Sequence, residues 1–235
     1  MKLILKLVAG VVALAIVSVA VLYFQDPIFW KRYQLLKEHR GILPQSGWEG
    51  SEFIVKGGEH RLFELVPQDQ RSIPEATLKQ VSDFAEQRNS SSLLVWHNDT
   101  LQFRKHYQGI DTDTEIVGKS MAKMVLSLAI ARAIKQGFIP SLDEPAASYL
   151  NEWQGTPKAK VTIRHMLHMA AGFEKYYTLD PSPFGKFMRS YIGGKNEQIM
   201  LNDYEVVNEP GSTYDYSQVT SDLLGLLLER ATGKP

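Results

Sequence analysis

Ser120 and Lys123, three residues apart, open the most apolar helix that the sequence predicts outside its N-terminal segment. Residues at this spacing lie one above the other on the same face of an α-helix. A serine hydroxyl becomes a strong nucleophile when a neighbouring group accepts its proton, and an amine can do so if burial lowers its pKa. The fold must therefore enclose this helix start in a site, and we expect Lys123 to be largely buried there.

A second polar stretch, far along the chain, contributes a phenol. Residues 214–218 contain Tyr216 and Gln218 and precede a leucine-rich helix over residues 220–230. A serine nucleophile, an amine and a phenol together suggest acyl transfer through a covalent intermediate. We therefore predict that Ser120 Oγ, Lys123 Nζ and Tyr216 Oη converge within hydrogen-bonding or one-water distance. Gln218 is expected to point into the same cleft.

Composition argues against several other functions. The 235 residues carry 26 basic and 26 acidic side chains, so no net field attracts nucleic acid. The chain has no cysteine, which removes disulfides, thiol nucleophiles and cysteine metal sites. It has no glycine motif for phosphate or dinucleotide binding, so we expect no cofactor. His165 and His168 lack a carboxylate that would complete a metal site, and we expect them to have a structural role at a helix start.

The N-terminal segment departs from this ordinary composition. Residues 7–24 form an uncharged run of 18 residues, the shortest length typical of a membrane-spanning helix. The alternative is a cleaved signal peptide with a small-residue processing site at residues 18–20. The apolar run continues past that site, and Trp30 follows at the distance of an interfacial aromatic residue. We therefore favour an uncleaved transmembrane anchor over residues 1–24.

The residues after the anchor divide into a linker and a domain. Residues 25–71 mix prolines and glycines with short apolar runs, which predicts a membrane-proximal linker with short strands, including a hairpin near residues 57–58. The domain is expected over residues 72–235. Pro74 suits an early helix position, and apolar residues repeat at helical spacing through Ala85.

A hairpin and the Ser120 helix follow in the predicted domain. Two strand-like runs, residues 92–97 and 101–107, flank a tight polar turn, which is typical of a β-hairpin. Gly137 is expected to end the next helix. Five apolar side chains along that helix have the spacing of residues that face a core, namely Met121, Met124, Val125, Leu128 and Ile134.

Four motifs follow one another between about residue 91 and the end of the chain. They are Gly118-Lys119-Ser120-Met121-Ala122-Lys123; Gly137-Phe138-Ile139 with Leu142-Asp143-Glu144-Pro145 and Tyr149-Leu150; Val161-Thr162-Ile163-Arg164-His165-Met166-Leu167 through Ala171-Gly172-Phe173; and Pro210-Gly211-Ser212 with Tyr216-Ser217-Gln218, Leu224-Gly225 and Ala231-Thr232-Gly233. In content and order, they resemble the motifs of the serine β-lactamase and penicillin-binding protein superfamily. The nearest branch is the class C β-lactamase-like, esterase and 6-aminohexanoate-dimer-hydrolase-like branch.

The resemblance implies a fold and a role for each site residue. The fold is α/β (α+β) and β-lactamase-like, with a helical lobe packed on an antiparallel sheet that is incomplete in this chain. Ser120 would be the acylated nucleophile, and its backbone N–H would form half of an oxyanion hole. Lys123 would be the general base or proton relay, and Tyr216 would share the proton and return it to the leaving group. Two such coupled groups titrate as a unit.

Two further residues are candidates for substrate binding. The family usually has an asparagine where this chain has Gln218, and the glutamine keeps the amide but extends it by one methylene. Tyr177, in the loop after Gly172, is expected either to contact the substrate or to pack within its loop. The family's third motif, a lysine- or histidine-containing triad ending in glycine, lies beyond residue 235. We therefore expect the chain to represent the N-terminal portion of such a domain.

These observations together predict a membrane-anchored serine hydrolase that acts through an acyl-enzyme on an amide, ester or β-lactam. Its substrate would be a small molecule or peptide-like. The expected location is the inner (cytoplasmic) membrane, with a single pass and the catalytic domain on the periplasmic or extracytoplasmic side. Gln218 and the missing third motif keep two alternatives open. One is a catalytically silent penicillin-recognition-like binding module, and the other is an inactive fragment.

Overall fold

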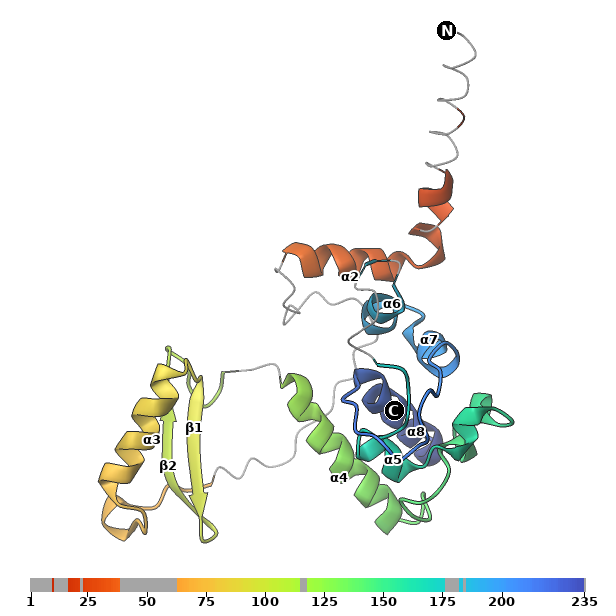
Figure 1. Ribbon diagram of the computed structural model, residues 1–235. Helices are drawn as coiled ribbons and strands as arrows, with labels where there is room; N and C mark the ends of the chain where they lie inside the picture. Colours follow the sequence, from red (N-terminus) through yellow and green to blue (C-terminus); the bar gives the residue numbers. More distant parts are fainter. Residues whose placement is uncertain are drawn as a thin grey trace. The chain divides into compact units, whose positions relative to one another are not determined.

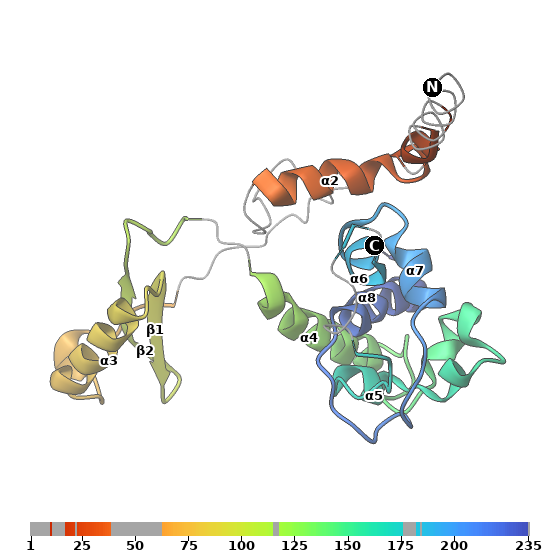
Figure 2. The same cartoon turned by 45° about the horizontal axis from the view of Figure 1, so that its top comes forward.

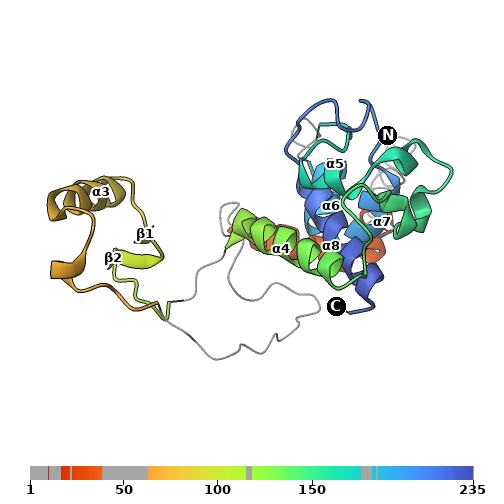
Figure 3. The ribbon, with the colours of Figure 1, turned by 90° about the horizontal axis from the view of Figure 1, so that it is seen from below.

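The computed structural model describes residues 10, 17–21, 23–38, 63–114, 118–175, 182–183 and 185–234. The chain divides into two compact units. We call Met1–Ser51 with Gly118–Pro235 the helical unit, and Glu52–Val117 the hairpin unit. Figures 1 to 3 show the ribbon from three directions, coloured along the sequence.

The hairpin unit is built on β1 (Ser92–His97) and β2 (Thr100–His106), which pair in antiparallel orientation (Figure 1). Asn98 and Asp99 join them with φ values of 48° and 58°. Two consecutive positive φ angles define the type I′ turn, whose twist matches that of the flanking strands. The predicted hairpin is therefore confirmed, with β2 beginning one residue earlier than expected.

One helix packs on this hairpin. A 3₁₀ turn, Gln68–Gln70, leads to α3 (Glu75–Gln87), which begins directly after Pro74 as predicted. Leu78 is 1% exposed on the buried side of α3. The hydroxyls of Ser82 and Tyr107 lie 3.0 Å apart, and this buried hydrogen bond ties α3 to the end of β2.

The first long helix of the helical unit corrects the expectation of a linker with short strands. Residues Pro27–Glu38 form α2, which packs on α6 (Lys186–Ile192) (Figure 1). Proline suits the first turn of a helix, and the Asp26 carboxylate accepts the backbone N–H of Phe29 at 3.0 Å. Phe29 is buried against α6. Local periodicity missed α2 because this tertiary contact stabilises it. The hairpin expected near residues 57–58 lies outside the described residues.

Most of the predicted membrane anchor, residues 1–24, lies outside the described residues. Within the part of the chain that the structure describes, none of the helices combines the length and the apolar character that crossing a membrane requires.

Helix α4 carries the Ser-x-x-Lys motif. A 3₁₀ turn, Lys119–Met121, leads into α4 (Ala122–Lys135), and Gly137 ends the helix with a left-handed φ of 81°, as predicted. The helix packs against α8 (Gln218–Thr232) (Figure 2). Ile130 and Ala133 are buried in the core of the helical unit, and Leu126 packs against that core.

The face of α4 predicted to meet a core is largely exposed in the structure. The exposed fractions of Met121, Met124, Val125 and Leu128 are 64%, 70%, 67% and 71%. Of the five residues named in that prediction, only Ile134 packs against the core. The helix has apolar residues on more than one face, and α8 covers only the face that includes Ile130. Periodicity alone therefore predicted the wrong face of α4 as the buried one.

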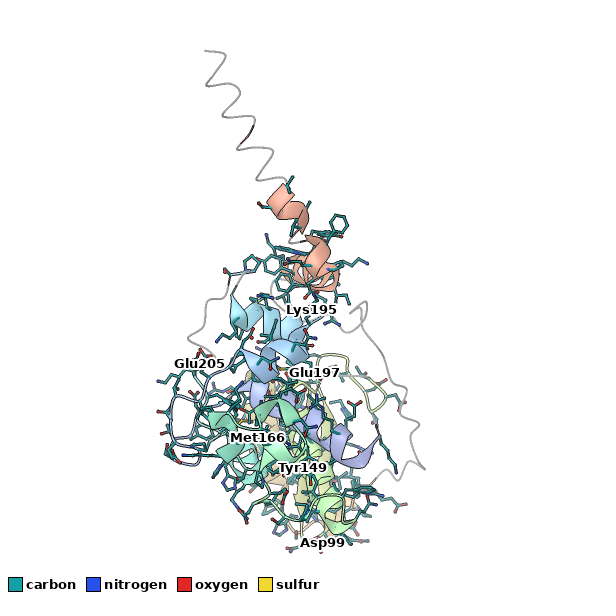
Figure 4. All side chains as sticks on the ribbon, turned by 90° about the vertical axis from the view of Figure 1, so that its right-hand side faces the viewer. Asp99, Tyr149, Met166, Lys195, Glu197 and Glu205 are labelled. Atoms are coloured by element: carbon teal, nitrogen blue, oxygen red, sulfur yellow. The ribbon has the colours of Figure 1, made fainter. Side chains whose placement is uncertain are left out.

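The connector between α4 and the rest of the helical unit consists of short helices. They are the 3₁₀ turns Ala146–Ser148, Asn151–Trp153 and Pro157–Lys160, then α5 (Ile163–Leu167) and, further along, α7 (Asn196–Asn202). Trp153 is fully buried, and its indole N–H donates to the carbonyl of Leu201 at the end of α7 at 3.0 Å. Met166 of α5 lies in the same core, below α7 in Figure 4. This core holds α4, α5, α7 and α8 together.

An ion pair joins two of the motifs that suggested the family. The guanidinium of Arg164 contacts both carboxylate oxygens of Asp143, at 2.7 and 3.0 Å. This hydrogen-bonded pair lowers the pKa of the Asp143 carboxyl. Backbone bonds from Ile163 to Glu144 and from Arg164 to Leu142 run beside it. The Leu-Asp-x-Pro segment and the Thr-Ile-Arg-His segment therefore form one connected structure.

Candidate active site

Ser120 lies in the 3₁₀ turn that precedes α4, where its side chain is exposed. The residue before it, Lys119, has a φ of 42°, a left-handed conformation that is uncommon outside glycine, asparagine and aspartate. Lys123 follows in the first turn of α4, one turn beyond Ser120. Its side chain is half-buried, rather than largely buried as we expected, because the face of α4 beside it is exposed.

Backbone contacts hold the segment that carries Tyr216 against the loop after α5. The N–H groups of Gly211 and Asp215 donate to the carbonyls of Ala170 and Met169, each at 2.7 Å. Gly172 accepts the N–H groups of Val207 and Asn208 at its carbonyl, at 2.8 and 3.0 Å. The segment is thus anchored before it reaches Tyr216 and the start of α8.

Gly172 is required by this close approach of two backbone segments. Its φ is 80°, and a Cβ built at this position would lie 2.3 Å from the carbonyl oxygen of Asn208. Real Cβ atoms essentially never come so close to a neighbouring atom, so any other residue would push the two segments apart. Gly172 therefore positions Tyr216 indirectly.

His165 has a structural role at a helix start, as predicted, whereas His168 lies at the C-terminal end of α5. The backbone N–H of His165 donates to the Thr162 hydroxyl at 3.2 Å, and the Thr162 N–H donates to His165 Nδ1 at 3.3 Å. This reciprocal pair caps α5. The ring also packs closely against Gly211, where a Cβ would lie 2.9 Å from Nε2.

The structure brings four predicted site residues together. Ser120 Oγ lies 2.7 Å from Tyr216 Oη, and either hydroxyl can donate. Lys123 Nζ lies 3.3 Å from Ser120 Oγ and 2.6 Å from Gln218 Oε1, and it donates to both. It also lies 5.3 Å from the centre of the Tyr216 ring. The predicted convergence of these side chains matches the observed geometry, whereas their catalytic roles stay predictions. Tyr177 lies outside the described residues.

The environment of Tyr216 favours its ionised form. The hydrogen bond with Ser120 lowers the pKa of the Tyr216 phenol, and the nearby Lys123 ammonium lowers it further. Desolvation opposes these effects and raises the pKa, but the net shift is downward. A lower pKa raises the fraction of Tyr216 that is phenolate near neutral pH, and the phenolate is the form that can accept a proton from serine.

Asp222 is a fifth polar residue of this cluster that we did not predict. Its Oδ1 accepts a hydrogen bond from Gln218 Nε2 at 2.7 Å. Burial raises the pKa of the Asp222 carboxyl, while the Gln218 hydrogen bond and the Lys123 charge act to lower it. The sequence contained little signal of this contact, because the helix was predicted over residues 220–230 and Gln218 lay before it. In the structure α8 begins at Gln218, which places the two residues four apart on one helix face.

A hollow of about 480 Å³ adjoins this cluster. Lys123, Gln218 and Asp222 form part of its wall, and apolar residues such as Leu126 and Met200 form another part. The hollow lies between α4, α7 and α8, so Lys123 and Asp222 are accessible from this side of the helical unit.

The sequence profile of the Beta-lactamase family matches residues 75–235. The chain therefore belongs to this family of serine hydrolases. No curated protein sequence matches the chain significantly.

Two solved structures have a similar fold. One, from Bacillus anthracis, is described as a 6-aminohexanoate-dimer hydrolase. It has a TM-score of 0.54 and 19% identity, and the match covers 66% of this chain and 43% of that one. The other, from Bacteroides dorei DSM 17855, is described as a β-lactamase. It has a TM-score of 0.51 and 22% identity, and the match covers 68% of this chain and 46% of that one. The chain thus spans less than half the length of either protein.

Proposed function

We propose that the protein is a serine hydrolase that forms an acyl-enzyme at Ser120. The observation that carries this proposal is the hydrogen bond of 2.7 Å between Ser120 Oγ and Tyr216 Oη, with Lys123 Nζ 3.3 Å from the same oxygen. A serine that occurs by chance three residues before a lysine would not be expected to meet a phenol from a distant segment. Proton transfer needs heavy atoms roughly 2.6–3.2 Å apart, and the Ser120–Tyr216 distance falls within this range.

In the proposed reaction, Tyr216 takes the Ser120 proton as Oγ attacks the carbonyl carbon of the substrate. Lys123 Nζ lies 5.3 Å from the centre of the Tyr216 ring, and its positive charge stabilises the phenolate form of Tyr216. The negative charge that develops on the carbonyl oxygen faces the backbone N–H of Ser120. Tyr216 then returns the proton to the leaving group as the carbonyl–leaving-group bond breaks. Water hydrolyses the acyl-enzyme by the reverse sequence of proton transfers.

The substrate class is an amide, ester or β-lactam in a small molecule or a peptide-like chain. All three present a carbonyl carbon that a serine oxygen can attack, followed by loss of an amine or alcohol. The uncharged run at residues 7–24 supports attachment to a membrane. In this proposal, the hydrolase lies on the extracytoplasmic side of the cytoplasmic membrane.

Covalent labelling tests the proposal directly. The purified protein is treated with a fluorescent fluorophosphonate and, separately, with a fluorescent penicillin, and the adduct is followed by gel fluorescence and intact mass. We expect at least one probe to add a single label, which Ser120→Ala abolishes. Labelling by the penicillin would point to lactam or peptide-like substrates, and labelling by the fluorophosphonate alone would point to esters or amides.

Ser127→Ala is the matched control. Ser127 is exposed on α4 two helical turns beyond Ser120, and its hydroxyl donates to the Lys123 carbonyl. This variant should label like the wild type. Failure of both probes, or labelling that persists in Ser120→Ala, would contradict the proposal. Saturable penicillin binding without an adduct would favour the catalytically silent binding module, which the glutamine at position 218 keeps as the second candidate.

A further inference from the structure

We propose that Asp222 is a positioning residue that holds the Gln218 amide in the orientation that presents its oxygen to Lys123. The inference rests on the proposed function. Three hydrogen bonds carry it: Gln218 Nε2 donates to Asp222 Oδ1 at 2.7 Å, Lys123 Nζ donates to Gln218 Oε1 at 2.6 Å, and Lys123 Nζ donates to Ser120 Oγ at 3.3 Å. Asp222 is thus connected to the nucleophile through two other side chains.

The chemistry of Lys123 and Asp222 determines which way the Gln218 amide points between them. An ammonium group only donates hydrogen bonds, and a carboxylate only accepts them. The amide of Gln218 lies between the two, and it satisfies both only when its oxygen faces Lys123 and its NH₂ group faces Asp222. The flipped amide would place an NH₂ group against the ammonium and an oxygen against the carboxylate. Asp222 therefore makes the productive orientation the stable one.

Helix geometry brings the two residues together. Gln218 is the first residue of α8, and Asp222 follows four residues later on the same face. Both side chains are half-buried, and a carboxylate in such a place is costly unless it is hydrogen-bonded. The length of glutamine lets one side chain reach back to Asp222 and out to Lys123. Gln218, which stands where the family usually has asparagine, is thus the residue that bonds to Asp222.

The consequence for the reaction is indirect. Gln218 Oε1 is the closer of the two oxygens that Lys123 Nζ contacts, so it determines where the ammonium lies relative to Ser120 and Tyr216. If the amide turned, Lys123 would lose its shorter hydrogen bond and become free to move away from Ser120. A displacement of about 1 Å at a reacting group can cost a hundredfold in rate. We expect a smaller effect here, because Lys123 keeps its contact with Ser120.

The test compares Asp222→Leu with Asp222→Asn. Leucine has a similar size but cannot accept a hydrogen bond, whereas asparagine keeps an acceptor oxygen in the same place. The readout is the second-order rate at which the fluorophosphonate labels Ser120. We expect Asp222→Leu to lower this rate by about tenfold and Asp222→Asn to stay within about threefold of the wild type. Asp222→Ala repeats the test if the leucine variant does not fold.

A double-mutant cycle separates positioning from a general effect on the structure. If Asp222 acts through Gln218, then Asp222→Leu should have no further effect in a Gln218→Ala background. Glu229→Leu is the matched control, because Glu229 lies on α8 two turns beyond Asp222 and is exposed. It should leave the labelling rate unchanged in both backgrounds.

The outcomes distinguish this inference from the proposed function. A wild type that labels at Ser120, with an Asp222→Leu variant that labels equally fast, would overturn the role of Asp222 and leave the hydrolase intact. The role of Asp222 would also be overturned if Asp222→Leu lowered the labelling rate by the same factor in the Gln218→Ala background. If the wild type does not label, nuclear magnetic resonance of the side-chain amides decides. The Gln218 NH₂ protons, whose signals are identified by their absence in Gln218→Ala, should exchange with solvent slowly in the wild type and rapidly in Asp222→Leu. Equal exchange in the two proteins would overturn the inference.

Discussion

The hydroxyl oxygens of Ser120 and Tyr216 lie 2.7 Å apart, although 96 residues separate them in the sequence. Ser120 is placed by the turn that starts α4, and Tyr216 by a segment whose backbone bonds to the loop after α5. The contact therefore depends on how α4, α5 and α8 pack around their shared core. It also makes the phenol the main proton acceptor in the proposed reaction, which leads to the first prediction.

Tyr216→Phe should lower the rate of fluorophosphonate labelling by about a hundredfold at neutral pH, because general acid–base groups typically contribute this much or more. In the wild type, the rate should rise with pH and level off below the ordinary tyrosine pKa near 10, since hydrogen bonding with Ser120 lowers the pKa of Tyr216. The variant should lose this rise. Tyr214→Phe, at a residue 69% exposed, is the control and should behave like the wild type. Equal rates for Tyr216→Phe and the wild type would remove Tyr216 from the mechanism.

Gly172→Ala should destabilise the helical unit by at least about 2 kcal/mol, through left-handed backbone strain and the clash with Asn208. Gly225→Ala is the opposite case. This glycine lies within α8 with no atom close to the added Cβ, so alanine should stabilise the helix by up to about 1 kcal/mol. Chemical denaturation of the two variants measures both effects. A Gly172→Ala protein as stable as the wild type would show that the backbone contact with Asn208 is not maintained.

Ile130→Ala should lower the free energy of unfolding by about 2–5 kcal/mol, because it leaves a cavity in the core between α4 and α8. Leu128→Ala, two residues earlier on the same helix, changes a side chain that is 71% exposed. It should alter stability by no more than about 0.5 kcal/mol. Urea denaturation compares the pair. A larger loss for Leu128→Ala than for Ile130→Ala would mean that the other face of α4 is the buried one.

The titration of Asp222 should be visible in the pH dependence of stability. Burial raises the pKa of this carboxyl in the folded protein above its unfolded value near 3.8, so the folded state binds the proton more tightly. The wild type should therefore lose stability from this group as the pH rises from about 3.8 through the raised pKa of Asp222 in the folded protein, and Asp222→Asn should not. The advantage of the variant over the wild type should grow with pH from about 3.8 upward and then level off. A pH-independent difference in stability between Asp222→Asn and the wild type would contradict the prediction.

Much of the local structure was predictable from the sequence, because short-range chemistry decides it. Asn98 and Asp99 between two β-branched and aromatic runs predicted the β1–β2 turn, and Gly137 predicted the end of α4. A structural role for His165 at a helix start was also predicted, although its part in capping α5 was not. The first and fourth family motifs contain the four side chains that the structure places together.

Other features depended on long-range packing that no local pattern contains. Helix α2 was missed because its stabilising contact, between Phe29 and α6, joins residues far apart in the chain. The wrong face of α4 was predicted to be buried, because apolar residues occur on two faces and only the position of α8 distinguishes them. Asp222 was overlooked because its significance depends on where the Gln218 amide points.

The sequence by itself determined which groups are available for chemistry, that is, a serine and a lysine one helical turn apart, and a phenol and an amide further along. It also determined the β1–β2 turn and the end of α4, since these depend on neighbouring residues. Only the tertiary structure decided that Tyr216 meets Ser120, that Lys123 is half-buried, and that Asp222 orients Gln218. The physical reason is that these distances and burials are set by the packing of α4 against α8 and of the Tyr216 segment against the loop after α5.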